Sequence, residues 1–446
     1  MRTRNILSWR VLAFVVLALI GPNVYAQSAQ GERRMMMPPE KIALRFPAGK
    51  NVVEVPFEVD RDLMLIRLSL NDSRPLRFVL DTGSQGTILN NPSVADSLHL
   101  NFVGTVQVRG TGSGPMGSAS IAEGVSFDIA GIALKGARLA VQPLRAGSPF
   151  SEYDGVIGRS VFDNLVAEVD WEKQLIRFYD PARYVYTGTG AILPLTFDEG
   201  GRPYTTARVV VAGGEAVPVK VVVDTGASHA LALDIGSHPG LRLPEGATPA
   251  VLGIGGNGEV RGHRGRVKSF QLGGYTLKDV PTSFPDASAG TAGIGGRQGN
   301  LGDAALRRFK IIYDYSRKRM IVEPNRFLNE PFGSPNLQST IASLPTITTS
   351  TGALQDYVGR YGNKEISVRD GGLYYQRIGG RGAALRAIAQ DKFALNTDAQ
   401  ITFVRDTKGI VTEMLIEWVE RDKERLKRES PAAGQSQSQP AQPGMK

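Results

Sequence analysis

The feature that most constrains this chain is an internal repeat with an offset of 143 residues. The letters FVLDTG around Asp81 return as VVVDTG around Asp224. Gly110 and Gly253 each follow their aspartate by 29 residues, and later matches keep the register or shift it by one residue. A register kept over more than 90 residues indicates two copies of one fold rather than two unrelated motifs.

Both copies contain apolar, β-branched runs closed by turn-forming residues, which is typical of β-strands. In the first copy, Leu63–Leu68 precedes the turn at Asn71-Asp72. In the second copy, Arg208–Val211 precedes Gly213-Gly214. The pattern predicts a mainly β fold of two pseudo-symmetric lobes. Few helices are expected, at Ser93–His99, Ser160–Leu165 and Asp303–Phe309.

Composition divides the rest of the chain. A stretch rich in Pro, Ser, Thr and Asn follows the repeat, and a low-complexity tail of Gln, Ser, Pro and Ala ends the chain. Between them, alternating runs around Asp370–Gly372 and Asp406–Gly409 predict the hairpins of a small antiparallel β domain. The expected segments are a signal peptide (1–26), an N-terminal extension (27–50), two lobes (51–186 and 190–325), a linker (326–351), the β domain (352–430) and a disordered tail (431–446).

The N-terminal segment has the layout of a secretory signal peptide. Arginines precede the apolar run Val11–Ile20, Gly21-Pro22 breaks it, and Val24–Ala26 offers a small-residue cleavage site. Ten apolar residues are too few to cross a bilayer, so no integral membrane segment is expected after cleavage. Export without any cysteine suits a bacterial periplasm or the cell exterior.

Several other functions are disfavoured by the sequence. The densest basic run, Arg421–Arg428, lacks interleaved aromatic residues, so no nucleic-acid partner is expected. The four histidines lack metal-ligand spacing, so no metal site is expected, and His229 is interpreted as a partly buried structural residue. Gly253–Gly258 has the form of a dinucleotide fingerprint, but no βαβ unit surrounds it, so no cofactor is expected.

The two Asp-Thr-Gly loops carry the chemistry. An apolar strand that delivers an aspartate into a tight turn, twice, can bring two carboxylates within hydrogen-bond distance. Like charges this close cannot both ionise, so the pair shares a proton and supplies one acid and one base. Such a pair can activate a water molecule for attack on a carbonyl while protonating the carbonyl oxygen.

These residues resemble the aspartic protease superfamily of pepsin-like and retropepsin-like enzymes over about 51–325. Gly155–Arg159 resembles the apolar strand and glycine behind the retropepsin loop, and Leu301–Asp314 resembles the pepsin counterpart. The resemblance implies two β-barrel lobes with a cleft between them, and peptide hydrolysis through a non-covalent intermediate. The implied site residues are Asp81 and Asp224 as catalytic groups, Thr82, Gly83, Ser84, Thr225, Gly226 and Ala227 as loop support, and Ile157, Gly158, Leu301 and Gly302 as the hydrophobic-Gly motif.

The chain departs from pepsin-like enzymes at the flap. Gly110–Ser120, where a flap tyrosine would lie, has no aromatic residue, and Gly253–Gly265 offers a second glycine-rich hairpin. A retropepsin-like cover of two flaps is therefore expected. Ser84 has no hydroxyl partner in the second loop, where Ala227 occupies the equivalent position. The two aspartates should therefore also differ electrostatically. The candidate flap glycines are Gly110, Gly112, Gly114, Gly253, Gly255 and Gly258.

The sequence thus predicts an exported, acid-leaning aspartic endopeptidase that acts on peptides or proteins. It needs no dimer, because both halves of the site are on one chain. The alternative is a module of the same fold that binds peptides or wall fragments and cleaves slowly or not at all. Highly restricted specificity or self-processing is a third reading. The C-terminal segment resembles a small β domain appended to some bacterial hydrolases.

Overall fold

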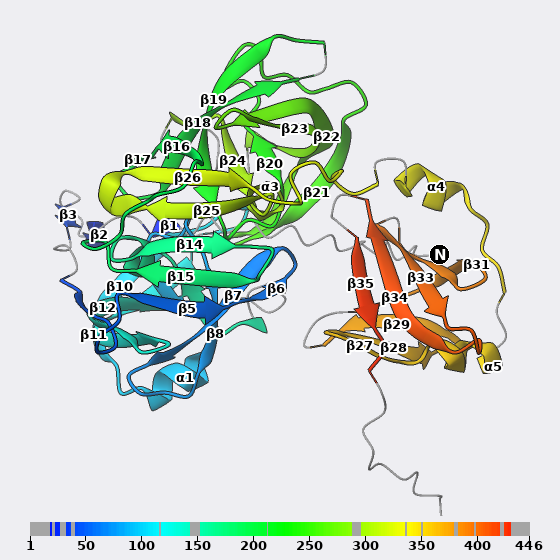
Figure 1. The fold of residues 1–446 in the computed structure, drawn as a ribbon, viewed down its shortest axis with the longest axis horizontal. Helices are drawn as coiled ribbons and strands as arrows, with labels where there is room; N and C mark the ends of the chain where they lie inside the picture. The colour runs from blue at the N-terminus through cyan, green and yellow to red at the C-terminus, as the bar shows by residue number, and fades with distance from the viewer. Residues whose placement is uncertain are drawn as a thin grey trace, which may run out of the picture. The chain divides into compact units, whose positions relative to one another are not determined.

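The computed structural model describes residues 41–429, and the backbone of three short strands before them. By internal packing the chain divides into two compact units, Met1–Phe332 and Gly333–Lys446 (Figure 1). The expected tail, 431–446, and most of the expected signal peptide lie outside the described residues, so both stay predictions. Within 41–429, the residues left undescribed are 116, 143–151, 212, 288–295, 335–336, 349–350, 379–381, 397 and 420–422.

The first lobe is a closed barrel of six strands, in the order β7-β8-β13-β9-β12-β11, because β11 pairs back onto β7. Asn71 and Asp72, in the predicted turn after β7, both have positive φ, which these residue types tolerate best. The barrel strands are β7 (Leu63–Leu70), β8 (Leu76–Leu80), β9 (Thr87–Leu89), β11 (Gly117–Ile129), β12 (Ile132–Val141) and β13 (Gly155–Ile157). Around them lie β1 (Ala18–Leu19), β4 (Ala43–Arg45), β6 (Glu58–Asp60), β10 (Asn101–Arg109), α1 (Pro92–Ser97) and α2 (Arg159–Phe162).

The second lobe repeats this barrel in the order β18-β19-β24-β20-β23-β22, closed where β22 pairs with β18. Two parallel pairs, β13 with β8 and β24 with β19, lie at equivalent places in the two barrels. The barrel strands are β18 (Pro203–Val210), β19 (Ala216–Asp224), β20 (Leu231–Leu233), β22 (Gly258–Leu272), β23 (Tyr275–Pro285) and β24 (Gly299–Gly302). Beside them lie β17 (Thr196–Phe197), β21 (Thr248–Gly255) and α3 (Asp303–Leu306).

A six-stranded sheet joins the two lobes, in the order β16-β26-β25-β14-β15-β5. Its centre is the antiparallel pair β14 and β25, in which Ala167 lies opposite Tyr313 and Val169 opposite Ile311. Each half of the repeat thus supplies three strands to one sheet. The strands are β5 (Val52–Pro56), β14 (Val166–Asp170), β15 (Leu175–Tyr179), β16 (Ala191–Pro194), β25 (Phe309–Asp314) and β26 (Arg319–Pro324).

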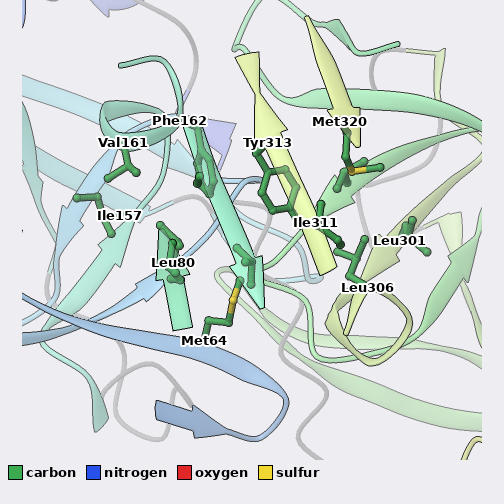
Figure 2. Close-up of a cluster of buried hydrophobic side chains, with 14 of the residues drawn as sticks. Met64, Leu80, Ile157, Val161, Phe162, Leu301, Leu306, Ile311, Tyr313 and Met320 are labelled. Carbon is green, nitrogen blue, oxygen red and sulfur yellow. The ribbon is translucent and has the colours of Figure 1, made fainter. Parts of the chain in front are cut away.

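The hydrophobic core is continuous through both lobes and the joining sheet. Its members come from both halves of the repeat and are fully or almost fully buried, and Figure 2 shows them together. Burial of this apolar surface is the main force holding the lobes together, since the chain has no cysteine. The labelled members are Met64, Leu80, Ile157, Val161, Phe162, Leu301, Leu306, Ile311, Tyr313 and Met320.

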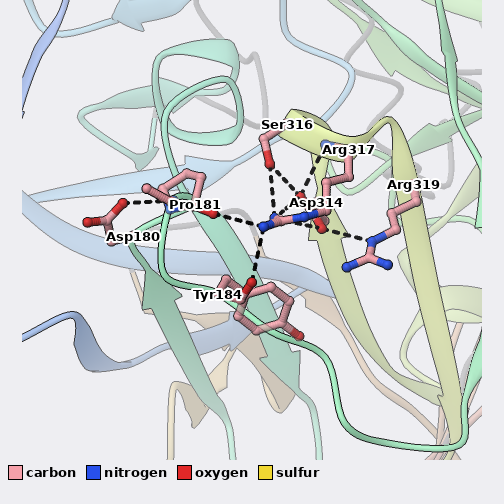
Figure 3. Close-up of polar contacts among 8 residues, drawn as sticks. Asp180, Pro181, Tyr184, Asp314, Ser316, Arg317 and Arg319 are labelled. Carbon is pink, nitrogen blue, oxygen red and sulfur yellow. Dashed lines mark hydrogen bonds and ion pairs between the residues drawn. The ribbon is translucent and has the colours of Figure 1, made fainter.

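A buried carboxylate also connects the halves. The side chain of Asp314, which is fully buried, accepts hydrogen bonds from Ser316 Oγ at 2.7 Å and Arg319 Nε at 2.8 Å. Arg317, from the 3₁₀ turn η4 (Tyr315–Arg317), binds Asp314 and also donates to the backbone oxygens of Pro181 and Tyr184, both at 3.1 Å (Figure 3). Pro181 and Tyr184 follow β15, so this arginine ties the second half to the end of the first.

The second unit is a small antiparallel β domain with an aromatic core that includes Tyr357, Phe393 and Phe403. Asp370 and Gly371 have positive φ and form the two-residue turn of the predicted hairpin. One sheet contains β27 (Gly359–Tyr361), β28 (Lys364–Arg369), β29 (Gly372–Arg377) and β30 (Gly382–Ala384); the other contains β31 (Arg386–Ala389), β32 (Lys392–Leu395), β33 (Ala399–Arg405), β34 (Val411–Trp418) and β35 (Glu424–Lys427). Short helical segments precede them: α4 (Leu337–Ser343), α5 (Thr351–Leu354) and η5 (Gln355–Tyr357).

The predicted fold class is confirmed: two pseudo-symmetric β-barrel lobes and a small antiparallel β domain. The segment expected as a linker, 326–351, includes the division between the two units, and two of its described side chains are buried. Phe332 is buried against the second lobe, where its ring lies 3.6 Å from the guanidinium carbon of Arg308. Farther along, Ile341 of α4 packs with Ile388 and Ala394. Phe332 and Ile341 of this Pro- and Ser-rich stretch thus pack into hydrophobic cores. No helix among the described residues is long and apolar enough to cross a membrane.

Candidate active site

Both Asp-Thr-Gly loops begin at the end of a central barrel strand. Asp81 follows β8, which lies between β7 and β13, and Asp224 is the last residue of β19, which lies between β18 and β24. The neighbouring strands remove both aspartates from solvent, and each has 0% exposure. The apolar residues before each aspartate are thus explained by their position in the barrel interior, as the repeat predicted.

The two threonines join the loops with near-perfect symmetry. Thr82 N–H donates to Thr225 Oγ1 at 2.9 Å, and Thr225 N–H donates to Thr82 Oγ1 at 3.0 Å. The hydroxyls in turn donate across the interface, Thr82 to the Val223 carbonyl and Thr225 to the Leu80 carbonyl, both at 2.7 Å. All four bonds are buried, so they hold the loops in one relative position.

Each loop glycine lies against the carboxylate of the opposite loop. A Cβ placed on Gly83 would lie 2.7 Å from Asp224 Oδ1, and a Cβ on Gly226 would lie 2.3 Å from Asp81 Oδ2. Any larger residue would therefore displace the opposite aspartate. The glycines are required because they allow the two carboxylates to approach each other.

The two aspartates differ in their hydrogen bonds and their pKa values. Burial and the charge of Asp224 raise the pKa of Asp81 well above its ordinary value, although Asp81 Oδ1 accepts the N–H groups of Gly83 and Ser84. Burial raises the pKa of Asp224 to about 6, opposed by hydrogen bonds from Asn300 and Gly226. Asp224 thus receives a donor on each of its oxygens, whereas Asp81 receives both of its donors on Oδ1.

The expected electrostatic difference between the aspartates is present, but its origin differs from the one expected. The hydroxyl of Ser84 donates to the Gly86 carbonyl at 2.9 Å, within its own loop. The decisive donor is instead Asn300, whose Nδ2 lies 2.6 Å from Asp224 Oδ2. Sequence reasoning missed Asn300, although the repeat offered a signal: the strand before Gly158 has Val156 where the strand before Gly302 has this asparagine.

The hydrophobic-Gly motifs support the loops from behind. Asp81 N–H donates to the Ile157 carbonyl at 2.9 Å, and Leu301 pairs with Val223 beside Asp224. A Cβ on Gly158 would lie 2.4 Å from the Ser84 carbonyl oxygen. In the second lobe, a Cβ on Gly302 would lie 2.2 Å from the backbone oxygen of His229 and 2.6 Å from that of Ala227.

The candidate flap glycines lie in two hairpins that contact each other. The first hairpin, β10–β11, places Gly110, Gly112 and Gly114 in its tip, and the second, β21–β22, carries Gly253, Gly255 and Gly258. Asn257 joins the tips: its Oδ1 accepts Gly110 N–H at 2.6 Å, and its backbone oxygen accepts Gly114 N–H at 2.7 Å. Gly112 and Gly258 adopt positive φ there. Asn257 was not singled out in the sequence, because an asparagine among glycines has the appearance of an ordinary turn residue.

Other polar groups are buried close to the dyad. His229 is 5% exposed, and burial lowers its pKa to about 3, so its imidazole is neutral. Arg297 and Asp234 form a buried ion pair at 3.2 Å. Asp303 is fully buried at the start of α3, and burial together with the charges of Asp224 and other carboxylates raises its pKa. Among the described residues, no group of three or more His, Cys, Asp or Glu side chains is arranged to hold a metal ion.

The family comparison agrees with a duplicated fold. Residues 66–161 and 207–303 each match the family model described as aspartyl protease. Among solved structures, the chain is similar to an aspartic proteinase from Irpex lacteus, with 14% sequence identity and a TM-score of 0.41, over 63% of this chain and 99% of that one. A search of curated proteins finds no match. The two family matches fall one on each lobe, and each includes one of the aspartates.

Proposed function

We propose that this chain, a bilobal aspartic protease fold with the family's domain in each lobe, hydrolyses peptide bonds with Asp81 and Asp224. The observation that carries the proposal is the pair of buried carboxylates, held close together by the threonine bonds and unequal in the donors that their oxygens receive. A pair with unequal pKa values can act as acid and base at the same pH.

In the proposed reaction, Asp224 takes a proton from a water molecule while the water oxygen bonds to the peptide carbonyl carbon. Asp81 gives its proton to the carbonyl oxygen, which produces a tetrahedral diol. The proton on Asp224 then passes to the peptide nitrogen, the C–N bond breaks, and a diol hydroxyl returns a proton to Asp81. The products are a carboxylic acid and an amine, and both aspartates regain their starting states.

We further propose that the protein acts outside the cytoplasm of a bacterium, in the periplasm or beyond it. The basic, apolar and small-residue order of 1–26 supports export. The substrates would then be peptides or proteins of that compartment, and the flap hairpins would close over them.

The test is cleavage of a mixed peptide library between pH 3 and 8, with new termini detected by mass spectrometry. Wild-type protein should cleave, whereas Asp81→Asn and Asp224→Asn should lose cleavage by at least about a thousandfold while remaining folded. Asp96→Asn, which changes an exposed carboxylate on α1, is the matched control and should cleave like wild type. Full activity in either dyad variant would refute the mechanism, and peptide binding without cleavage would support the binding-module alternative.

A further inference from the structure

The two halves of the site break their symmetry at one position. The strands behind the loops are Val156-Ile157-Gly158 and, in the second lobe, Asn300-Leu301-Gly302. Val156 pairs in parallel with Val79, and Asn300 pairs in parallel with Val222. A buried asparagine in an otherwise apolar barrel strand is costly unless its amide is satisfied. The hydrogen bonds of the Asn300 amide therefore indicate the role of this residue.

Asn300 is 1% exposed, and its Nδ2 lies 2.6 Å from Asp224 Oδ2. A carboxylate can only accept hydrogen bonds, so this contact assigns the amide nitrogen to the side facing Asp224. Oδ1 of Asp224 accepts Gly226 N–H at 3.0 Å, so both oxygens of this carboxylate receive a donor. Asp81 receives its two donors on Oδ1 alone.

His229 lies behind the asparagine. Its ring interacts with the backbone and the side chain of Asn300, which opposes the effect of burial on its pKa. Burial still lowers this pKa to about 3, so the imidazole is neutral above that pH and presents a single N–H. The carboxamide oxygen of Asn300 can only accept hydrogen bonds, so a neighbouring N–H suits it better than it would suit the amide nitrogen. His229 thus favours the amide orientation in which nitrogen faces Asp224.

The remaining titratable groups around Asp224 come from four other elements. Asp81 lies across the dyad, and Asp303 of α3 and Tyr313 of β25 both interact electrostatically with Asp224. Arg297, just before β24, lowers the pKa of Asp224, but its effect is smaller than that of Asn300. Asp81 also forms a hydrogen bond with Asp224 that lowers the pKa of Asp224, and its effect is likewise smaller than that of Asn300.

We propose that Asn300, oriented by neutral His229, is the positioning residue that keeps Asp224 ionised and leaves the shared proton on Asp81. This assignment rests on the proposed peptide hydrolysis for its catalytic meaning, but the proton placement itself does not. A hydrogen bond to a carboxylate stabilises the charged form, so the asparagine sets the lower pH limit at which the dyad contains a base. The acid and base roles are thus fixed by one amide.

The principal variant is Asn300→Val, because valine occupies the equivalent position, Val156, in the first lobe. Loss of the donor should move the acidic limb of the kcat/KM profile upward by about one pH unit, the size expected for a lost hydrogen bond to a charged group. Thr282→Val is the matched control. Thr282 is buried in the same lobe, and its hydroxyl donates to the Val280 carbonyl, so the limb should stay where it is.

A second measurement does not need activity. In urea unfolding between pH 4 and 8, the raised pKa of Asp224 contributes a loss of stability with rising pH, which is measured as the difference between variant and wild type. Asn300→Val should steepen this loss, whereas Thr282→Val should keep the wild-type slope. His229 stays neutral throughout this range, so a uniform loss of stability in the variant does not affect the comparison. Asn300→Ser, which is too short to reach the carboxylate, provides the same comparison if the valine variant does not fold.

The outcomes separate the two proposals. If wild type cleaves nothing but Asn300→Val steepens the stability slope, peptide hydrolysis is refuted and the placement of the proton stands. If wild type cleaves and neither the acidic limb nor the slope moves in the Asn300 variants, the role of Asn300 is refuted and hydrolysis stands. A shift in Thr282→Val equal to that in Asn300→Val would also overturn the assignment.

Discussion

The carboxamide oxygen of Asn257 accepts the backbone N–H of Gly110 at 2.6 Å, across 147 residues of sequence. The same side chain donates through Nδ2 to the Pro115 carbonyl at 3.0 Å. One asparagine in the second hairpin therefore holds the tip of the first. The contact is asymmetric, because Asn257 has no counterpart in the first hairpin tip, where the residues are glycine, serine, threonine and proline.

Asn257→Ala should loosen the flaps. It removes three side-chain hydrogen bonds, each worth about 0.5–1.5 kcal/mol, so the Gly110 amide should exchange with solvent roughly tenfold faster. Hydrogen exchange measured by mass spectrometry on peptides covering the tips provides the test. Thr105→Ala, an exposed change on β10, should leave the exchange rate at wild-type level. Unchanged exchange in Asn257→Ala would show that the backbone bonds alone hold the flaps.

The threonine bonds predict a strong dependence of stability on the hydroxyl group. Thr225→Val keeps the shape of the side chain but leaves the buried N–H of Thr82 without its acceptor. We expect a loss of about 1–3 kcal/mol in the free energy of unfolding, together with lower cleavage activity. Thr225→Ser retains the hydroxyl, so its loss in the free energy of unfolding should be less than half that of Thr225→Val. Equal losses in the two variants would show that the methyl group, rather than the hydroxyl, is important.

The pKa of Asp224 predicts the pH dependence of activity. Asp224 must be ionised to act as the base, so kcat/KM should rise as pH increases through about 6. It should fall again at higher pH as Asp81, whose pKa is raised by burial and by Asp224, loses its proton. The profile of an optimised peptide substrate between pH 3 and 9 tests this. An optimum near pH 3 would contradict the prediction and support the acid-leaning enzyme expected from the sequence.

The same pKa predicts an effect on stability. Unfolded aspartate ionises near pH 4, but burial keeps Asp224 protonated until about pH 6, so the contribution of Asp224 to stability should be greatest below pH 4 and fall as pH rises through 6. Asp224→Asn removes this loss. The variant should therefore be more stable than wild type at pH 7.5, by on the order of 2–3 kcal/mol, and similar to it at pH 3.5.

Urea unfolding at the two pH values measures this difference. Asp96→Asn again serves as the control, and its stability should follow that of wild type at both values. Equal stability of Asp224→Asn and wild type at pH 7.5 would show that ionised Asp224 costs the folded state little.

The network around Asp314 predicts that Arg317 is important for holding the halves together. Arg317→Gln removes the ion pair and the donors to the Pro181 and Tyr184 carbonyls. We expect a loss of about 1–3 kcal/mol in the free energy of unfolding, because Arg317 pairs with the fully buried carboxylate of Asp314. Arg183→Gln, which changes an exposed arginine nearby, should cost less than about 0.5 kcal/mol. Thermal denaturation of the two variants makes the comparison.

The sequence was most informative wherever the repeat kept its register. The two lobes, the buried aspartates and the crossed threonines follow from Asp81 and Asp224 occupying equivalent points of a duplicated fold. The pairing of β14 with β25 could not be predicted, because strands so far apart in sequence carry no local sign of their partner. Asn300 could have been found by comparing it with Val156, since a polar residue at an apolar position of a repeat marks a break in symmetry.

The segment after the repeat was harder to predict for another reason. Its Pro, Ser and Thr content indicates a linker, but Phe332 and Ile341 decide its structure by entering two different cores. Composition is an average over many residues, so it does not reveal that a single apolar side chain in a polar segment is buried. The same limit applies to Asn257, whose role depends on a partner more than a hundred residues away.

The sheet that joins the lobes has a consequence for how the protein is made. Three of its six strands, β16, β25 and β26, come from the second half of the repeat, the last ending at Pro324. The chain is synthesised from its N-terminus, so the first lobe is made before β25, the strand that pairs with one edge of β14. Asp81 has no partner until Asp224 has been synthesised, at about half the length of the chain. The sheet that joins the two lobes is complete only when nearly three quarters of the 446 residues have been synthesised.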